Sequence, residues 1–147
     1  RCWSLIGVAP IVHVNGSFQN TNVYGAYTFD SKFHYKFVVK QLATKTIAFL
    51  ERLRKIYQKI FFIIDRATWH TAKIVQKYFK KHSKNIRVEY FPITSPDLNP
   101  VEECWRQTRK NVTSNTAFDE TKKLKKALTK EWKKQPFKHK IINYLCS

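Results

Sequence analysis

The chain has 147 residues, of which 43% are hydrophobic, 15% aromatic and 26% charged, so it can bury the core of one domain and does not have the composition of a disordered chain. Lys and Arg total 28 against 10 Asp and Glu, and the resulting net charge of +18 favours a polyanionic partner. No apolar run approaches the roughly 20 residues of a membrane-spanning helix, and no signal-peptide pattern occurs, so we expect a cytoplasmic, nucleoid-associated protein.

Strand signals dominate the first 40 residues. Pro10–Val14 alternates apolar and polar residues and predicts a strand, which is followed by a turn signal at Asn15-Gly16. Asn22–Phe29 and His34–Val39 are rich in aromatic and β-branched residues, which suit a half-buried pleated surface. These two segments therefore predict a β-hairpin.

The hydrophobic pattern then changes to that of an α/β fold. A stripe at helical spacing predicts a helix through Ile47, Leu50, Leu53 and Tyr57. Ile60–Ile64 (IFFII) shows no alternation and predicts a strand buried on both faces, as in a parallel sheet. A second helical stripe, formed by Ile74, Val75, Tyr78 and Phe79, precedes a second late strand, Ile86–Tyr90. The order of elements predicts an α/β fold in which an antiparallel part joins a parallel part.

A proline-containing loop, Phe91–Leu98, leads into the first of two C-terminal helices. Asn99 is placed to cap this helix, Pro100 suits its first position, and Glu102 stands three residues after the cap. The inner stripe of the helix is predicted to be Val101, Cys104, Trp105, Thr108 and Val112.

The last predicted helix, roughly Asp119–Lys133, lies in a basic segment that covers about residues 116–147. It packs Leu124, Leu128 and Trp132, and its other face carries Lys122, Lys123, Lys125, Lys126, Lys130 and Lys133. Nucleic acid is the first candidate partner for this charge, and an anionic membrane surface is the second. A lineage with lysine-rich proteins would account for the net charge, but not for its concentration near the end of the chain.

The cysteine pattern argues against a structural zinc site. Cys2, Cys104 and Cys146 are far apart, and no CxxC or His-Cys cluster occurs. We expect reduced, partly buried thiols.

Two acids occupy positions where chemistry is common. Asp65 ends the most apolar strand, and Glu102 lies in the first turn of the helix after the second late strand. Sites in open α/β sheets gather at the carboxyl ends of strands, and two converging carboxylates need a cation between them, for which Mg²⁺ is suited. Each acid also has a structural interpretation: Asp65 can cap the following turn, and Glu102 can close a capping box with Asn99.

The surrounding segments favour the metal site. Ser95–Trp105 (SPDLNPVEECW) closely resembles the signature SPDLNPIE-x-x-W of mariner-like DDE transposases, above all those of prokaryotic insertion sequences. Phe61–His70 (FFIIDRATWH) resembles that family's hydrophobic strand followed by D-N-A-x-x-H, and Glu102 follows Asp65 by 37 residues, as the family's spacing requires. A weaker upstream similarity involves Trp3, Gly7, Pro10 and Val23–Ala26.

The resemblance implies a ribonuclease-H-like mixed sheet flanked by helices, in a single catalytic domain over residues 1–147. It implies three acids that hold two Mg²⁺ or Mn²⁺ ions and that carry out strand cleavage and strand transfer at transposon ends. Asp65 would be the second acid and Glu102 the third, with His70 and Asn99 at the edge of the site. The intact protein would be a homodimer that bridges two DNA ends, which are recognised by an upstream helix-turn-helix region.

The chain departs from the family pattern in several places. Arg66 replaces the usual Asn, and Ile93 and Thr94 stand where Pro and Tyr are common. No Asp precedes Asp30, which falls in the predicted hairpin turn and is a poor substitute for the first acid. Because the chain also begins at Arg1 and contains no Met, we interpret it as truncated, without the first acid and the central strand.

The remaining polar residues receive simpler roles. Asp97 suits a Ser-Pro-Asp turn, Glu103 a solvated helix position and Trp105 the core. Phosphate contacts, or alternatively a solvated face with helical ion pairs, are expected for Arg66, Arg106, Arg109, Lys110, Lys122 and Lys126.

Two other functions stay open. A catalytically dead, DNA-binding remnant of a transposase is favoured by Arg66 and by the missing first acid. A cellular ribonuclease-H-like nuclease, such as a junction resolvase, is disfavoured by the NPVE motif and its following Trp.

Overall fold

The computed structural model describes residues 21–93, 95–114, 116–134, 137 and 140. The predicted strand Pro10–Val14, its turn signal and the upstream similarity around Trp3 and Gly7 lie outside these residues, as do Cys2, Cys146 and Thr94. The chain divides into two compact units. We call them the α/β unit (Asn22–Ala26 with His34–Asn99) and the helical unit (Tyr27–Phe33 with the described residues from Pro100 onward).

The predicted hairpin is confirmed. Strands β1 (Asn22–Tyr27) and β2 (Phe33–Val38) pair with one another, and a short turn joins them. In the turn, the Thr28 hydroxyl donates to Asp30 Oδ1 at 2.5 Å, and Ser31 takes the left-handed conformation with φ 61°. Asp30 also pairs with Lys32 at 2.8 Å, so this acid serves the turn.

The α/β unit contains a parallel strand pair. Strands β3 (Ile60–Ile64) and β4 (Ile86–Tyr90) run parallel, with Ile60 opposite Ile86 and Ile64 opposite Tyr90. The Phe91 N–H extends this ladder by donating to the Ile64 carbonyl at 2.9 Å. Among the described residues, β1–β2 and β3–β4 form two separate two-stranded sheets.

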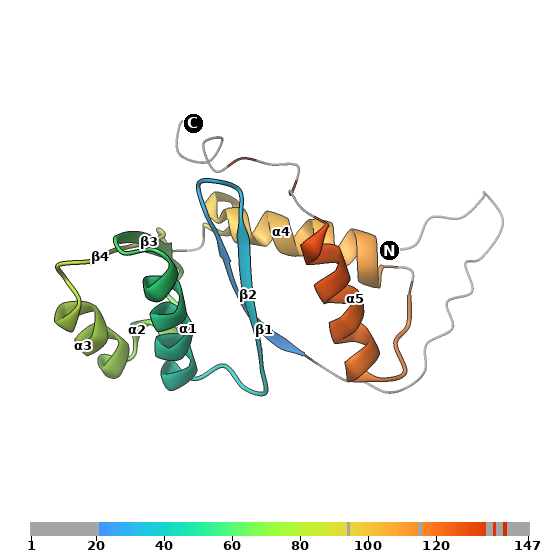
Figure 1. Cartoon of the computed structure of the whole chain (residues 1–147), viewed down its shortest axis with the longest axis horizontal. Helices are drawn as coiled ribbons and strands as arrows, with labels where there is room; N and C mark the ends of the chain where they lie inside the picture. The colour runs from blue at the N-terminus through green and yellow to red at the C-terminus, as the bar shows by residue number, and fades with distance from the viewer. Residues whose placement is uncertain (1–20, 94, 115, 135–136, 138–139, 141–147) are drawn as a thin grey trace. The chain divides into compact units, whose positions relative to one another are not determined.

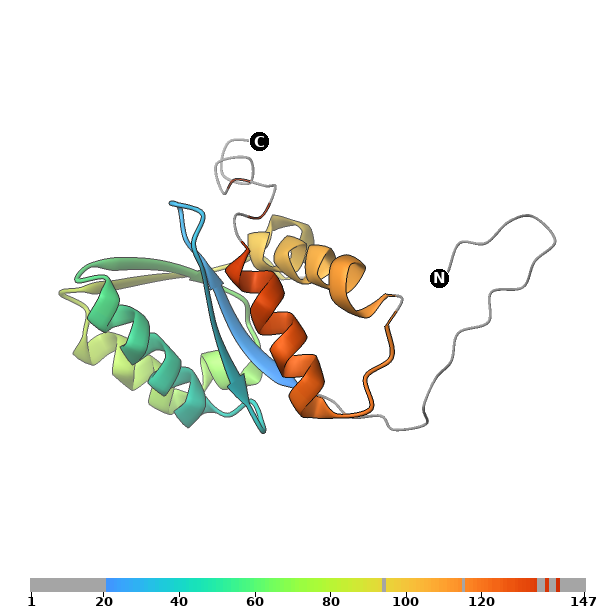
Figure 2. The same cartoon turned by 45° about the vertical axis from the view of Figure 1, so that its right-hand side comes forward.

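Helices cover one face of the parallel pair. Helix α1 (Ala43–Ile56) and helix α3 (Lys73–Lys81) lie side by side against it (Figure 2). Their buried side chains form one cluster with the strands, built from Leu50, Val75, Phe79 and Ile86. A second cluster joins β1 to α1 through Tyr24, Phe49 and Leu53. The predicted helical stripes supply Leu50, Leu53, Val75 and Phe79 to the buried faces of these helices, but Ile74, a predicted member of the second stripe, is 45% exposed.

The prediction that Ile60–Ile64 is buried on both faces is wrong for the described part of the chain. Phe61 is 56% exposed and Ile63 36% exposed, because both point away from α1 and α3. The Arg87 guanidinium lies 5.5 Å from the centroid of the Phe61 ring and covers part of it. Apolar residues thus occupy both faces of β3, while helices of the α/β unit cover only one of them.

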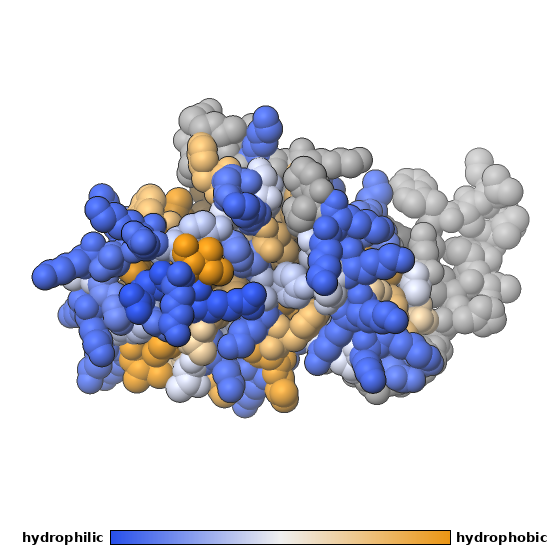
Figure 3. Space-filling model, viewed as in Figure 1, coloured by the Kyte–Doolittle hydropathy of each residue, from blue (hydrophilic) through white to orange (hydrophobic). Residues whose placement is uncertain are grey.

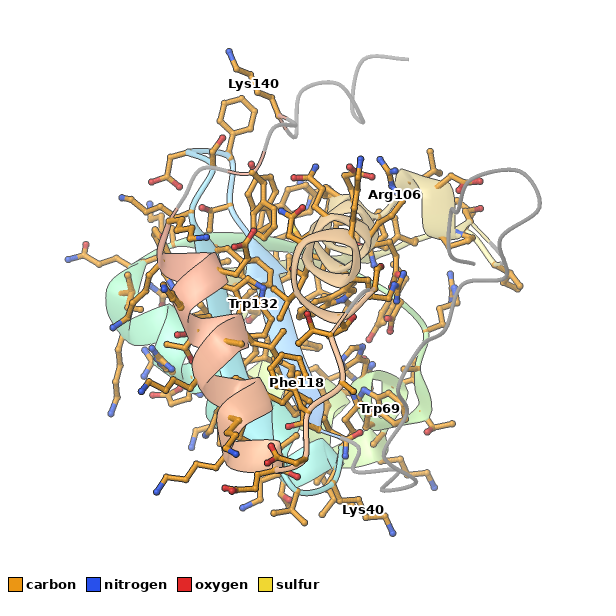
Figure 4. The ribbon with its side chains drawn as sticks, turned by 90° about the vertical axis from the view of Figure 1, so that its right-hand side faces the viewer. Lys40, Trp69, Arg106, Phe118, Trp132 and Lys140 are labelled. Carbon is orange, nitrogen blue, oxygen red and sulfur yellow. The ribbon has the colours of Figure 1, made fainter. Side chains whose placement is uncertain are left out.

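The helical unit is built around Trp132. Helix α4 (Pro100–Thr108) and helix α5 (Thr121–Lys133) pack together (Figure 1), and Trp132 points from α5 toward α4 (Figure 4). Its indole N–H donates to the Thr108 hydroxyl at 2.8 Å, and that hydroxyl donates to the Cys104 carbonyl at 2.7 Å. Phe33 packs edge-on against Trp132 and Trp105, so Trp105 has the predicted packing role.

Two helix boundaries differ from the prediction. After Thr108 the chain continues as a π-helical segment, η2 (Arg109–Thr113), because the Arg109 carbonyl accepts from the Ser114 N–H and hydroxyl at 2.8 and 2.9 Å. Helix α5 begins at Thr121, two residues later than predicted, because Glu120 has extended dihedral angles (φ −131°, ψ 137°). No helix in the described residues is long and apolar enough to cross a membrane.

Glu51 provides a charged clamp between α1 and α3. Arg54 donates to both of its carboxylate oxygens, at 2.6 and 2.9 Å, and the Tyr78 hydroxyl donates at 2.7 Å. These hydrogen bonds, that from Arg54 above all, lower the pKa of Glu51 to about 2. A carboxyl whose folded-state pKa is depressed stabilises the fold above its unfolded pKa, and this contribution disappears as pH falls toward 2.

We therefore predict that Glu51→Gln lowers the melting temperature at pH 7 by a few degrees, on the order of 1 kcal/mol for a partly exposed ion pair. The difference from the unmodified chain should shrink between about pH 4.5 and pH 2, as calorimetry across this range can measure. Glu89→Gln is the matched control, since Glu89 is 56% exposed and meets Arg87 only at 3.5 Å. A difference that is the same at pH 2 and pH 7 would contradict the clamp.

Candidate active site

Asp65 lies at the carboxyl end of β3, where the backbone leaves the parallel pair. Its Oδ1 accepts the Ala67 N–H at 3.0 Å and the His70 Nδ1–H at 2.6 Å. Its Oδ2 accepts no hydrogen bond within the described ranges, and the side chain is 52% exposed. One carboxylate oxygen is therefore fixed by the protein, and the other is open to a ligand.

Asp65 is held in its ionised form. The hydrogen bond from His70, with smaller contributions from the Ala67 N–H and from the charge of His70, places the pKa of the carboxyl below its ordinary value, although partial burial acts in the opposite direction. A carboxylate that is ionised at neutral pH suits a hard divalent cation. Asp65 caps the following turn, as the structural interpretation predicts, but it does so through Oδ1 alone, which accepts the Ala67 N–H.

His70 is a partner of the candidate acid. It lies in the short helix α2 (Thr68–Thr71), and its side chain is 18% exposed. Because the ionised Asp65 can only accept, Nδ1 carries the hydrogen, which leaves Nε2 as the second ring nitrogen. The rings of Tyr24 and Trp69 lie 6.3 and 6.0 Å from the His70 ring and confine it.

Tyr24 and Trp69 are absent from the residues that sequence reasoning selected for the site. Trp69 could have been found, because it is adjacent to His70 in the chain. Tyr24 could not, because it comes from β1, 46 residues earlier. Its hydroxyl is fixed at 3.0 Å from the Thr46 hydroxyl, which places its ring beside α1 and α2.

Arg66 follows the candidate acid but points to the neighbouring strand. Its Nε donates to the Phe91 carbonyl at 3.2 Å, and its guanidinium lies 5.3 Å from the centroid of the Tyr90 ring. The Tyr90 hydroxyl in turn accepts a hydrogen bond from the Gln76 side chain. Arg66 therefore links the carboxyl ends of β3 and β4, an interaction that the sequence did not predict.

Glu102 lies in the first turn of α4, as predicted, and its side chain is exposed. The structural alternative for this residue was a capping box, in which its carboxylate would accept a backbone N–H at the helix start. No hydrogen bond or ion pair to the Glu102 carboxylate exists in the described part of the chain. The capping box is not formed, and the carboxylate is available for a ligand.

Glu103 differs from its prediction as a solvated helix residue. Its side chain is 17% exposed and accepts from both Arg106 Nε and Nη2, at 2.6 and 2.7 Å, and from Gln107 Nε2 at 2.7 Å. The expectation is wrong because residues three and four positions further along the helix supply donors to it. Arg106, a predicted phosphate contact, thus donates two hydrogen bonds from its guanidinium to the Glu103 carboxylate.

The other predicted residues are exposed or half-buried. Asp97 lies in the short helical turn η1 (Pro96–Leu98), in agreement with a turn role. Asn99 follows this turn in extended conformation, and its N–H donates to the Pro96 carbonyl at 3.0 Å. Exposed positions in the helical unit are occupied by Arg109, Lys110, Lys122 and Lys126. No group of three or more metal-ligating side chains forms among the described residues.

We predict that His70→Ala raises the pKa of Asp65 toward the ordinary value of about 3.9, because the strongest hydrogen bond to the carboxylate is removed. Carbon-13 NMR titration of the side-chain carboxyl measures this directly. His82→Ala is the matched control, since His82 packs against Tyr78 with ring centroids 4.6 Å apart and is not a hydrogen-bond partner of Asp65. An Asp65 pKa that is equal in both variants would refute the role of His70.

Two features of the described residues characterise the candidate site and the fold around it. An ionised carboxylate with one open oxygen stands at the carboxyl end of a parallel strand pair, and an antiparallel hairpin precedes this pair in the chain. The fold is that of ribonuclease-H-like catalytic cores. It matches a catalytic core domain of BIV integrase with a TM-score of 0.55 at 17% identity, over 74% of this chain and 70% of the integrase chain.

The same fold occurs in Mos1 transposase. A Mos1 mariner paired end complex with Mn matches with a TM-score of 0.70 at 18% identity, over 98% of this chain and 46% of that chain. A Mos1 paired-end complex with left transposon end gives a TM-score of 0.66 at 19% identity, over 93% of this chain and 44% of that one. At these identities the likeness concerns the fold.

Sequence comparison identifies the family. Residues 1–125 match the family described as DDE superfamily endonuclease. The Tc3 transposase of Caenorhabditis elegans is 30% identical over 144 residues, which cover 91% of this chain and 43% of Tc3. The chain belongs to the DDE superfamily endonuclease family, and it spans less than half the length of that transposase.

Proposed function

We propose that this chain forms the greater part of a transposase catalytic domain, which carries out metal-dependent DNA strand cleavage and strand transfer at transposon ends. The observation that carries the proposal is the state of Asp65. It is ionised, half exposed and open on Oδ2, in a chain whose residues 1–125 match the DDE superfamily endonucleases. Asp65 would be the second acid of the family's three, and Glu102 the third.

The donor set fits Mg²⁺ or Mn²⁺. Asp65 Oδ2 and the Glu102 carboxylate are hard oxygen ligands that no other described residue engages, and such ions prefer carboxylate oxygens and retain several waters. The related Mos1 fold is known in a complex with Mn. Two ions bound in such a site neutralise the attacking and leaving oxygens of a phosphodiester. We propose Asp65 and Glu102 as the ligands that this chain contributes.

The chain's own residues would prepare the acid for this task. The Ala67 N–H and His70 Nδ1–H fix Oδ1, so that Oδ2 faces outward without further reorganisation. Tyr24 and Trp69 restrict the His70 ring and thereby fix its hydrogen bond to Asp65. Arg66 links the ends of β3 and β4 by donating to the Phe91 carbonyl. Its guanidinium is therefore directed to the neighbouring strand and not to the Asp65 carboxylate.

DNA is the proposed substrate and partner. The net charge of +18 favours a polyanion, and Mos1, whose fold is shared, is known with a left transposon end. We further propose that the two units form one catalytic domain, that the intact protein acts as a homodimer on paired ends, and that it works in the nucleoid.

A second candidate function is a DNA-binding remnant without catalysis. The observation in its favour is that Asp30, the first Asp in residues 1–147, is engaged by Thr28 and Lys32 in the hairpin turn. Two acids hold two metal ions poorly, so residues 1–147 by themselves should not cut DNA. Arg66 supports a remnant less strongly, because its guanidinium is engaged by Phe91 and Tyr90.

We predict that Asp65→Asn and Glu102→Gln each weaken Mn²⁺ binding about tenfold or more, because each removes a charged ligand. Isothermal calorimetry or electron paramagnetic resonance on the whole chain measures the affinity. Asp97→Asn removes an equal charge from an exposed acid close in sequence to Glu102 and should leave Mn²⁺ affinity unchanged. Equal affinities for all three variants would exclude the proposed ligands.

A further inference from the structure

The lysines of α5 divide into two groups according to their partners. Three acids occur between residues 119 and 134, and all three are engaged. Asp119 and Glu120 lie 2.6 and 3.5 Å from Lys123, and Glu131 lies 3.2 Å from Lys134. Glu131 also accepts from Asn111 at 2.7 Å. The acids of this segment thus pair with Lys123 near the start of the helix and with Lys134 just after its end.

Four exposed lysines take no part in these ion pairs: Lys122, Lys126, Lys130 and Lys133. Their spacing puts them within an arc of roughly 80° on one side of the helix, given about 100° per residue. We call them the lysine stripe. The stripe is about 16 Å long, and members at i and i+4 are ~6 Å apart along the axis.

The opposite face of α5 is occupied. Leu128 is 6% and Trp132 3% exposed, and the Trp132 indole is hydrogen-bonded to Thr108 on α4. The stripe therefore points away from α4, and hydrophilic side chains gather over α5 on the molecular surface (Figure 3). An anionic membrane does not suit this helix, because a helix that lies in a membrane surface must offer its apolar face to the lipid.

The stripe is unfavourable in the free protein. Like charges at i and i+4 destabilise a helix by a few tenths of a kcal/mol for each pair. A row of phosphates would remove this repulsion and release its own counterions on contact. Lysine ammonium groups on flexible stems bind phosphates as point charges and read no base sequence.

We propose that the lysine stripe of α5 is a sequence-independent contact surface for the sugar-phosphate backbone of double-stranded DNA. This inference rests on the proposed function in taking DNA as the partner, and it assigns the contact to one face of one helix. From the basic face that the sequence predicts, it selects the four residues of the lysine stripe, and it leaves out Lys123 and Lys134, which pair with acids.

The test compares two double variants of the whole chain that remove the same net charge from the same helix. Lys126→Gln/Lys130→Gln removes two stripe residues, and Lys123→Gln/Lys134→Gln removes the two paired lysines. Fluorescence anisotropy with a labelled 30-base-pair duplex of arbitrary sequence gives the dissociation constant at several KCl concentrations. The slope of log affinity against log salt changes by about 0.9 for each phosphate that the protein no longer neutralises.

The stripe variant should bind with a slope that is shallower by about 2, whereas the paired-lysine variant should keep the original slope. Equal slopes in the two variants would overturn the proposal, since net charge alone would then explain binding. Tighter, stripe-dependent binding to poly-glutamate than to the duplex would also overturn it and indicate an acidic protein partner. Circular dichroism should give a melting temperature for the stripe variant no lower than that of the unmodified chain, because repulsion is relieved.

The outcome is separable from that of the proposed function. Asp65→Asn should leave the salt dependence of DNA binding unchanged while weakening Mn²⁺ binding, because a metal ligand lies outside the stripe. Absence of the slope difference with retained Mn²⁺ binding at Asp65 would reject the stripe alone. A retained slope difference with no Mn²⁺ binding at Asp65 would reject the metal site alone.

Discussion

The parallel pairing of β3 with β4 determines where the candidate site begins. Because both strands run in one direction with Ile64 opposite Tyr90, the segments that follow them leave the sheet at the same edge. Asp65 is the first residue after one strand, and Phe91 is the first after the other. Arg66 joins these two exits by donating to the Phe91 carbonyl, so the acid stands on a backbone held at both strands. A loop alone would not position a carboxylate to this degree.

The next constraint is the hydrogen bond between His70 and Asp65. A carboxylate has two oxygens, and in the described part of the chain two donors engage one of them and none engages the other. This arrangement orients the side chain, keeps it ionised and leaves the second oxygen for a cation. The short helix α2 exists at this place because the Ala67 carbonyl accepts the His70 and Thr71 N–H groups, at 2.8 and 3.1 Å, which turns His70 back toward Asp65.

Local patterns predicted much of the fold, and motif spacing selected the candidate site residues. The hairpin follows from its aromatic and β-branched residues, α1, α3 and β4 follow from apolar periodicity, and β3 follows from an unbroken apolar run, and each of these is a local pattern. The exposed face of β3 was not predictable, because an unalternating run such as IFFII does not say which faces are covered. Spacing selected Asp65, His70 and Glu102, but it did not reveal that Arg66 binds the neighbouring strand, because such partners depend on tertiary packing.

The central claim is that the Asp65 and Glu102 carboxylates bind the same divalent cations. Long-wavelength anomalous diffraction from crystals of the protein grown with Mn²⁺ tests it most directly. We expect manganese peaks at coordination distance, about 2.1 Å, from Asp65 Oδ2 and from a Glu102 oxygen within one metal cluster. Manganese peaks that touch neither carboxylate, or that contact the two acids at separate places on the protein, would contradict it.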